Sequence, residues 1–142
     1  RGRLCFLLVA QTLTASELAE SDPCVILNNT VYSAEASTST VKFGIAASLT
    51  GSYAHNFGDG YCRTLQLWME MVENAGGMVT ANGQSVAVHF LIEDAGSPKT
   101  DLVAEAVGKL ITAHDIDVIL SPYSSTLTPL AAAAALPYGV PV

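Results

Sequence analysis

Residues 117–136 read DVILSPYSSTLTPLAAAAAL, and they give the clearest indication of the fold. The stretch opens with residues 117–120, in which three apolar residues follow Asp117, and these predict a buried strand. A loop crowded with hydroxyl side chains follows, and the alanine-rich run after it predicts a helix from about 127 to 136. Pro129 fits that helix only in or next to its first turn, because proline has no N–H to donate. The stretch therefore predicts a strand, a loop and a helix in immediate succession.

The same order occurs twice before this stretch. Short apolar runs predict strands at 41–46 and 86–92, and apolar side chains at helical spacing predict helices at 57–75 and 98–113. Residues 139–142 are typical of a segment that leads into a fourth strand. Repeated strand–helix alternation predicts an α/β fold: a three-layer, Rossmann-like parallel sheet with helices on both faces. We expect the crossovers between its strands to be right-handed.

The first 40 residues differ in character from the rest. A basic start precedes an apolar run, residues 4–10, which has the length of a signal-peptide core and is too short to span a bilayer. A buried strand is the alternative interpretation of that run. Residues 11–40 are mostly small and polar, with weak periodicity. We therefore expect residues 1–40 to be a signal-like leader and linker outside the sheet, and residues 41–142 to form the domain.

The sequence contains three cysteines, Cys5, Cys24 and Cys62. An odd number cannot all pair within one chain, and their spacing is unlike that of metal ligands. We interpret them as unpaired or removed with the leader. A Cys24–Cys62 disulfide is the alternative, although nothing in the sequence demands it.

Composition excludes several classes of function. The chain carries six basic and thirteen acidic residues, a net charge of −7. Nucleic-acid binding needs clustered lysine and arginine, which the sequence lacks, and an anionic membrane surface would repel the chain. The sequence has no G-x-S-x-G elbow, P-loop or dinucleotide fingerprint, and its three histidines are scattered. We expect no catalytic residue, no metal and no cofactor, and hence no enzyme.

The loop after the third predicted strand is the most informative candidate site. Ligands of parallel α/β sheets bind at the carboxyl ends of the strands. There, Ser124, Ser125 and Thr126 lie before a helix N-terminus, where free N–H groups and the helix dipole favour a carboxylate. Helix capping alone is the alternative, because it needs only one of these hydroxyls. Tyr123, in the same loop, is a further candidate ligand contact.

The loop after the first predicted strand adds Thr50, Tyr53 and Phe57. Apolar and aromatic walls with a few polar groups are typical of a small-molecule cleft. The alternative is that Tyr53 and Phe57 only pack the entry of the helix. The two loops together predict a ligand-binding site at one edge of the sheet.

Five motifs along residues 41–142 carry a resemblance to a known family. They are VKFGI at 41–45, SLTG at 48–51, QLWMEMVENAGG at 66–77, EDAGSP at 93–98 and VILSPYSS at 118–125. In this order and spacing they resemble the opening of type I periplasmic binding proteins. The most similar group is the branched-chain amino acid or amide-binding subunits of ABC transporters.

The resemblance implies two Rossmann-like lobes that close on a ligand by a hinge, with this chain as part of the first lobe. It implies extracytoplasmic binding of an amino acid or similar small solute, for delivery to an ABC transporter permease. In such proteins the hydroxyls and amides after the third strand hold the ligand carboxylate, which corresponds here to Ser124, Ser125 and Thr126. The aromatic side chain at the exit of the first loop corresponds to Phe57. The alternative is the extracellular sensor of a membrane receptor, which a transmembrane helix elsewhere in the gene product would distinguish.

Overall fold

The structure is a computed structural model that describes residues 23–28, 31–32, 39–55, 59–96 and 100–142. Its helices are α2 (Pro23–Leu27), α3 (Asp59–Asn74), α4 (Thr100–Thr112), α5 (Leu127–Ala135) and the short 3-10 helix η2 (Leu136–Tyr138). Its strands are β1 (Val31–Tyr32), β2 (Thr40–Ala47), β3 (Met78–Val79), β4 (Ser85–Asp94) and β5 (Val118–Leu120). The three predicted strands and the three predicted helices are therefore confirmed, with ends that differ by a few residues.

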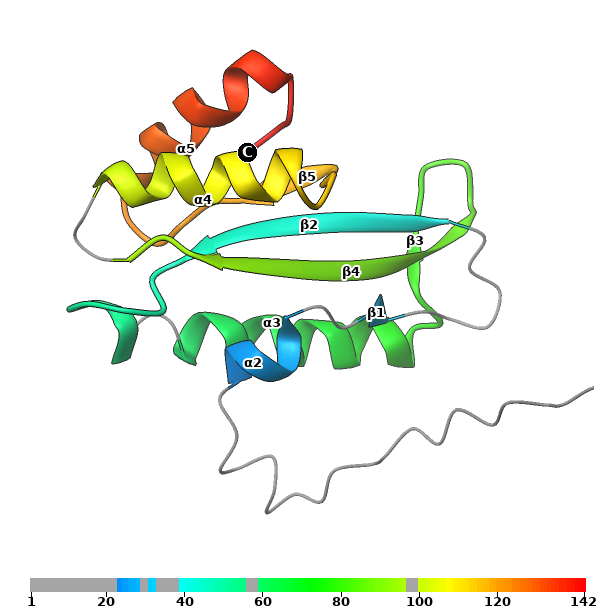
Figure 1. Cartoon of the computed structure of the whole chain (residues 1–142). Coiled ribbons are helices and arrows are strands. Elements are labelled where there is room, and N and C mark those ends of the chain that lie inside the picture. Colours follow the sequence, from blue (N-terminus) through cyan, green and yellow to red (C-terminus); the bar gives the residue numbers. More distant parts are fainter. Residues whose placement is uncertain (1–22, 29–30, 33–38, 56–58, 97–99) are drawn as a thin grey trace, which may run out of the picture.

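The sheet is built around β2, which lies between β4 and β5 and is parallel to both. Phe43 marks the register, because it lies opposite Phe90 on β4 and Val118 on β5. Two short strands extend the sheet along β4: β1 and β3 both pair with it antiparallel. The predicted α/β class with a parallel sheet is thus confirmed (Figure 1).

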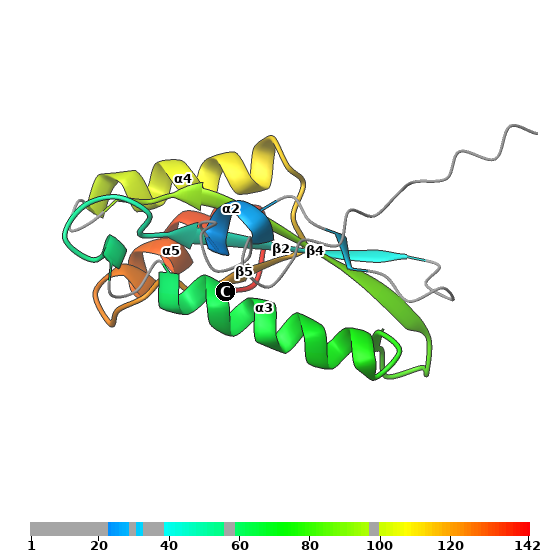
Figure 2. The same cartoon turned by 90° about the horizontal axis from the view of Figure 1, so that it is seen from below.

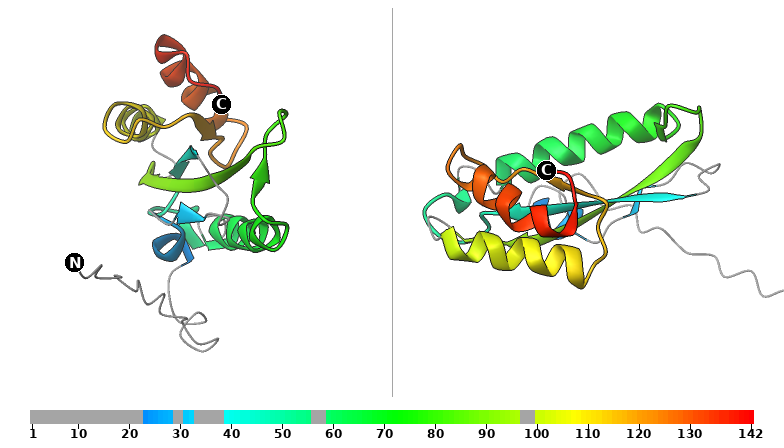
Figure 3. Two further views of the ribbon diagram at one scale, coloured as in Figure 1. Left: turned by 90° about the vertical axis from the view of Figure 1, so that its right-hand side faces the viewer. Right: turned by 90° about the horizontal axis from the view of Figure 1, so that it is seen from above.

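Helices cover both faces of this sheet. Seen end-on, α4 and α5 lie on one side and α2 and α3 on the other (Figure 3). Successive side chains of a strand point to opposite faces, so Ala46 joins the core under α4 and α5 while Ile45 and Ala47 join the core under α3. Chain order explains this arrangement: β4 and β5 flank β2 on opposite sides, and right-handed crossovers then place α3 and α4 on opposite faces.

The close approach of α4 to β2 depends on Gly44. A Cβ atom at this position would lie 2.4 Å from Cδ1 of Ile116 and 3.3 Å from Cβ of Leu110. Since Leu110 is fully buried in the core under α4, a larger side chain at position 44 would push the helix away from the sheet.

Residues before 40 take part in the domain, which corrects the expectation that they stay out of the sheet. We call α2 and β1 the N-terminal strap. Cys24 and Leu27 are buried against α3 and the sheet, and β1 pairs with β4. Helix α2 lies on the same face of the sheet as α3 (Figure 2). Asn28 Oδ1 accepts a hydrogen bond of 2.8 Å from the Ile92 N–H. The predicted signal-peptide core, residues 4–10, lies outside the described residues.

The strap is tied to α3 by a disulfide between Cys24 and Cys62, whose Cα atoms lie 5.1 Å apart. The interpretation of these cysteines as unpaired was therefore wrong. The Gln66 side chain adds a second tie, because its Nε2 donates to the Pro23 carbonyl at 3.1 Å. A five-residue helix and a two-residue strand are too short to be stable alone, so the strap depends on these ties and on its buried side chains.

We predict that losing the disulfide loosens the strap. Cys24→Ala with Cys62→Ala should lower the free energy of unfolding by about 2–4 kcal/mol, because the bond closes a loop across a separation of 38 residues. Urea denaturation of the 142-residue chain measures the change. A reductant should destabilise the natural chain and leave the double variant unaffected; a natural chain that is equally stable with and without reductant would contradict the prediction.

Candidate functional site

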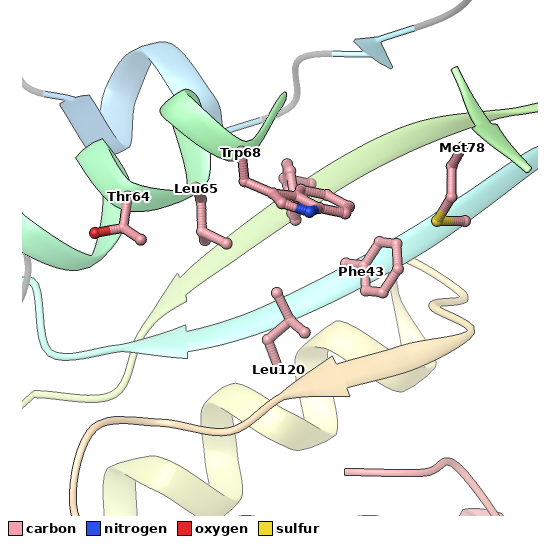
Figure 4. Close-up of a pocket in the computed structure, with 7 residues that line it drawn as sticks. Phe43, Thr64, Leu65, Trp68, Met78 and Leu120 are labelled. Carbon is pink, nitrogen blue, oxygen red and sulfur yellow. The ribbon is translucent and has the colours of Figure 1, made fainter. Parts of the chain in front are cut away.

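Three loops meet at one edge of the sheet, where the parallel strands β2, β4 and β5 all end. Their arrowheads point the same way in Figure 4. The loops begin at residues 48, 95 and 121, and the structure describes the first through residue 55 and the second through residue 96. Because this is the carboxyl edge of a parallel sheet, it is the expected place for a ligand.

Asp94 organises the first of these loops. Its Oδ1 accepts hydrogen bonds from the N–H groups of Leu49 (3.0 Å), Thr50 (3.2 Å) and Gly96 (2.8 Å), and its Oδ2 accepts one of 2.6 Å from the Thr50 hydroxyl. Partial burial raises the pKa of Asp94, but the hydrogen bonds from Thr50, Gly96 and Leu49 outweigh it and hold the pKa below its ordinary value. The carboxylate thus fixes the first loop against the end of β4.

This network engages Thr50, whose predicted contact with a ligand stays a prediction. The Thr50 hydroxyl donates to Asp94, so it shapes the loop rather than facing a ligand with a free donor. The sequence analysis missed Asp94 because its partners at Leu49 and Thr50 lie more than forty positions away. The contact with Gly96, two residues on, is an Asx turn, and the sequence Asp94-Ala95-Gly96 could have indicated that part.

Glu93, the neighbour of Asp94, makes its side-chain contacts away from the first loop. Its carboxylate contacts His114 Nε2 at 3.1 Å and Lys109 Nζ at 2.9 Å, and so ties β4 to α4 and to the loop that follows it. Partial burial raises the pKa of Glu93, and the contacts with Lys109 and His114 lower it further than burial raises it. Glu93 and Asp94 therefore do not act on one shared site.

Ser124 caps the N-terminus of α5. Helix capping was the alternative interpretation of the hydroxyl residues in this loop. The Ser124 Oγ accepts a hydrogen bond of 3.1 Å from the Leu127 N–H, and its carbonyl accepts from the Thr128 N–H and hydroxyl. Its backbone has φ of 124°, a left-handed conformation that is costly for a residue with a side chain. The Ser124 hydroxyl hydrogen remains a donor, because the cap uses only the oxygen.

Ser125 and Thr126 are the hydroxyl residues of this loop that remain available. Both are exposed, and neither side chain takes part in a hydrogen bond or ion pair with any part of the chain that the structure describes. Tyr123, next to them, is nearly half exposed. The third loop thus presents two uncommitted hydroxyls beside a strained residue at the N-terminus of a helix.

Two tyrosines lie nearby in different settings. The Tyr61 hydroxyl donates to the Ser121 carbonyl at 3.4 Å and so connects α3 to the start of the third loop. Burial raises the pKa of Tyr61, which keeps the hydroxyl protonated. Tyr53 is half-buried in the first loop. Phe57, the other aromatic residue predicted for this site, lies outside the described residues.

Ser48 is a feature of this edge that the sequence did not reveal. It follows β2 directly and is only 3% exposed, yet its hydroxyl has no hydrogen-bond partner among residues 23–28, 31–32, 39–55, 59–96 and 100–142. A buried hydroxyl without a partner is unfavourable and calls for an explanation.

A separate hollow lies on the face of the sheet under α3, which we call the apolar groove (Figure 4). It has a volume of about 380 Å³ and is lined by Phe43, Thr64, Leu65, Trp68, Met78, Phe90 and Leu120. Thr64 brings the one hydroxyl in this lining, and it already donates to the Gly60 carbonyl at 2.8 Å. Apart from the indole N–H of Trp68, the lining is apolar, and the groove is distinct from the loops at the carboxyl edge.

Two further properties of the described residues bear on the class of site. Among the described residues, no group of three or more His, Cys, Asp or Glu is placed to hold a metal ion. Over those same ranges, none of the helices has the length and apolar character required to cross a membrane.

Solved structures of solute-binding proteins are similar to this chain. The branched-chain amino acid transporter substrate-binding protein of Streptococcus pneumoniae, in complex with isoleucine, has a TM-score of 0.59 and 26% identity. A solute-binding protein of an ABC transporter from R. palustris, in complex with benzoate, has a TM-score of 0.55 and 26% identity. A second one from R. palustris, in complex with 4-hydroxybenzoate, has a TM-score of 0.57 and 22% identity.

The matched region covers 72% of this chain for the Streptococcus pneumoniae protein, 71% for the benzoate complex and 72% for the 4-hydroxybenzoate complex. The chain spans only 27%, 26% and 26% of the length of those proteins. No family model matches the sequence, and a search of curated proteins found no match.

We predict that Asp94→Asn loosens the first loop. The variant keeps the shape of the side chain but removes the charge and one acceptor, so the free energy of unfolding at pH 7 should fall by about 1–2 kcal/mol, a modest value because the carboxylate is exposed. The pKa of Asp94 lies below its ordinary value of 3.8 in the folded chain. Its stabilisation is therefore complete above that value and is lost as the pH falls through the folded pKa.

Urea denaturation at pH 7 and at about pH 3 measures both effects. Glu70→Gln, which removes an exposed carboxylate from α3, is the matched control and should change neither. If Asp94→Asn lost stability with acid as steeply as the natural chain, Asp94 would not be the group responsible.

Proposed function

We propose that this chain, which has the type I periplasmic binding fold of branched-chain amino acid and related ABC transporter substrate-binding proteins, forms part of the first lobe of an extracytoplasmic solute-binding protein. The observation that carries the proposal is the third loop. Ser125 and Thr126 present exposed, uncommitted hydroxyls at the N-terminus of α5, on the carboxyl edge of a parallel sheet.

The ligand class follows from the donors at this edge. Isoleucine and benzoate, which two of the similar proteins hold, differ in size and in amino group but share a carboxylate. Hydroxyl donors at the positive end of a helix dipole suit such a group. Ser124 adds its O–H, and the buried Ser48 hydroxyl is a further donor at the same edge. We therefore assign the carboxylate of an amino acid, or of a similar small solute, to this loop.

An ammonium group of the ligand needs a partner outside the described residues of this edge. Asp94 is a carboxylate at this edge, but it already accepts four hydrogen bonds, from Leu49, Thr50 and Gly96. The second lobe of a two-lobed protein is the natural source of the remaining contacts. Delivery of the captured solute to an ABC transporter is then the role of the whole protein.

The disulfide supports an extracytoplasmic location. Structural disulfides persist in oxidising compartments and are rare in the cytosol of most organisms. Cys24–Cys62 holds the N-terminal strap on the core, so it has a structural role. The signal-like start of the sequence agrees with the same compartment.

The proposal predicts that Ser125→Ala and Thr126→Val weaken ligand binding in the full-length protein. Each hydrogen bond to a charged ligand contributes about 1.5–3 kcal/mol, so each variant should raise the Kd roughly ten- to a hundredfold. Isothermal titration calorimetry with isoleucine and with benzoate measures this. Thr112→Val, which removes a hydroxyl from the far end of α4, is the control and should leave the Kd unchanged.

Two results would overturn the proposal. One is full affinity in both variants, which would leave the third loop as a helix cap only. The other is that the natural protein binds neither compound. The 142-residue chain alone should bind both ligands far more weakly than the full-length protein, because one wall of a cleft cannot exclude water from the polar contacts.

A further inference from the structure

β4 has one edge that pairs with β2 and a second edge, which we call the outer edge, that faces away from it. The Ala87 N–H donates to the Ser39 carbonyl at 2.8 Å on the β2 side. Successive N–H groups of a strand face opposite edges, so the N–H groups of Val88 and Ile92 face the outer edge. Free N–H and C=O groups along such an edge are a template on which another strand can pair.

The sequence of β4 (Ser85–Asp94) makes its outer edge prone to pairing. Residues 85–92 read SVAVHFLI and contain no Asp, Glu, Lys, Arg, Pro or Gly. Valine, isoleucine and phenylalanine favour strands, and an uncharged run of this kind pairs with other chains when it is exposed. Edge strands usually prevent this with a charged side chain or a proline, and β4 has neither before Glu93.

The N-terminal strap covers the outer edge instead. β1 pairs antiparallel with Val88 and His89 of β4. The register, in which Val31 lies opposite His89, places Asn28 opposite Ile92 when it is continued back along the chain. There Asn28 Oδ1 accepts the Ile92 N–H at 2.8 Å. The carboxamide oxygen thus accepts the hydrogen bond that a carbonyl of a neighbouring strand would accept.

The disulfide fixes this cover in place. A two-residue strand and a five-residue helix do not stay folded alone, so β1 and Asn28 depend on what holds α2. The Cys24–Cys62 bond joins α2 to α3, and Leu27, the residue before Asn28, is fully buried against the same core. Loss of the bond would therefore release the cover together with α2.

We propose that the N-terminal strap shields the outer edge of β4 from a second copy of the chain, and that the Cys24–Cys62 disulfide keeps this shield in place. Without the disulfide the strap leaves the edge, and β4 of a second copy pairs there. The chain is monomeric at this edge because the strap occupies it. This inference concerns association of the chain and does not depend on the proposed ligand.

β4 of a second copy fits the freed edge in antiparallel orientation. Pairing centred on Phe90 sets Val88 of each copy opposite Ile92 of the other, so the outward N–H groups find carbonyls. Glu93 and Asp94 of the two copies then lie at opposite ends of the shared ladder, whereas parallel pairing would bring them side by side. The net charge of −7 opposes association at long range, and salt screens this repulsion.

Sedimentation velocity and NMR-detected hydrogen exchange of the 142-residue chain test the proposal. Cys24→Ala with Cys62→Ala removes the disulfide, and a salt concentration of about 0.15 M screens the net charge. We expect the double variant to form dimers as its concentration rises. In dilute solution the Val88 and Ile92 amides of the variant should exchange at least about tenfold faster than in the natural chain, and their exchange should slow again where dimers form.

Two control variants separate this effect from general destabilisation. Val25→Ala changes an exposed residue of the strap and should behave as the natural chain does. Leu110→Ala opens the core on the opposite face without touching the strap, and should give no dimer with protected Val88 and Ile92 amides. Three results would overturn the proposal: a double variant that stays monomeric with slow exchange at Ile92, dimers whose Val88 and Ile92 amides stay exposed, or the same protected dimer from Leu110→Ala.

Asn28→Ala tests the cover with the disulfide intact. The variant removes the acceptor of the Ile92 N–H but leaves β1 paired with Val88 and His89. We expect the Ile92 amide to exchange at least about tenfold faster than in the natural chain and the Val88 amide to keep its rate. An unchanged rate at Ile92 would show that the Asn28 side chain does not cover this edge.

Discussion

The parallel pairing of β2 with both β4 and β5 places the loops and the helices of this domain. Because the three strands run the same way, their carboxyl ends share one edge and bring together loops that are about seventy residues apart in the chain. Because β2 is central, the crossovers on its two sides place helices on opposite faces. The close contact of α4 with this strand needs the missing side chain at Gly44.

Some polar side chains at the carboxyl edge hold the loops in place, and others are exposed on the loops without a partner in the described chain. Asp94 holds the first loop, and Ser124 caps α5 in a left-handed conformation that a serine adopts at some cost. Both sets of contacts are made within the described chain. Ser125 and Thr126 are left without side-chain partners in the described structure, which is why they carry the proposal for ligand binding.

The two flanks of α3 show two solutions to the same packing problem. On the β4 side, a short helix that could not be stable alone is held in place by a disulfide and by the Gln66–Pro23 hydrogen bond. On the β5 side, the described chain supplies no cover, and the aromatic side chains of Phe43 and Trp68 border a hollow. The difference lies in topology, since the N-terminal strap precedes β2 and is free to fold back on this face.

Sequence patterns were enough to predict the α/β class, the three parallel strands, the three main helices and the loop that carries Ser124, Ser125 and Thr126. The spacing of apolar residues and the residue types at the ends of helices and strands indicate these features. Both signals extend over only a few positions. Four features became visible only in the folded chain: Cys24 pairs with Cys62, β1 joins the sheet, Asp94 binds the Thr50 hydroxyl, and Ser124 caps α5. With the exception of the cap, these contacts join residues that are far apart in the chain, so no local pattern encodes them. The sequence left open whether the Ser124 hydroxyl binds an N–H, and the structure shows that its oxygen accepts from the N–H of Leu127.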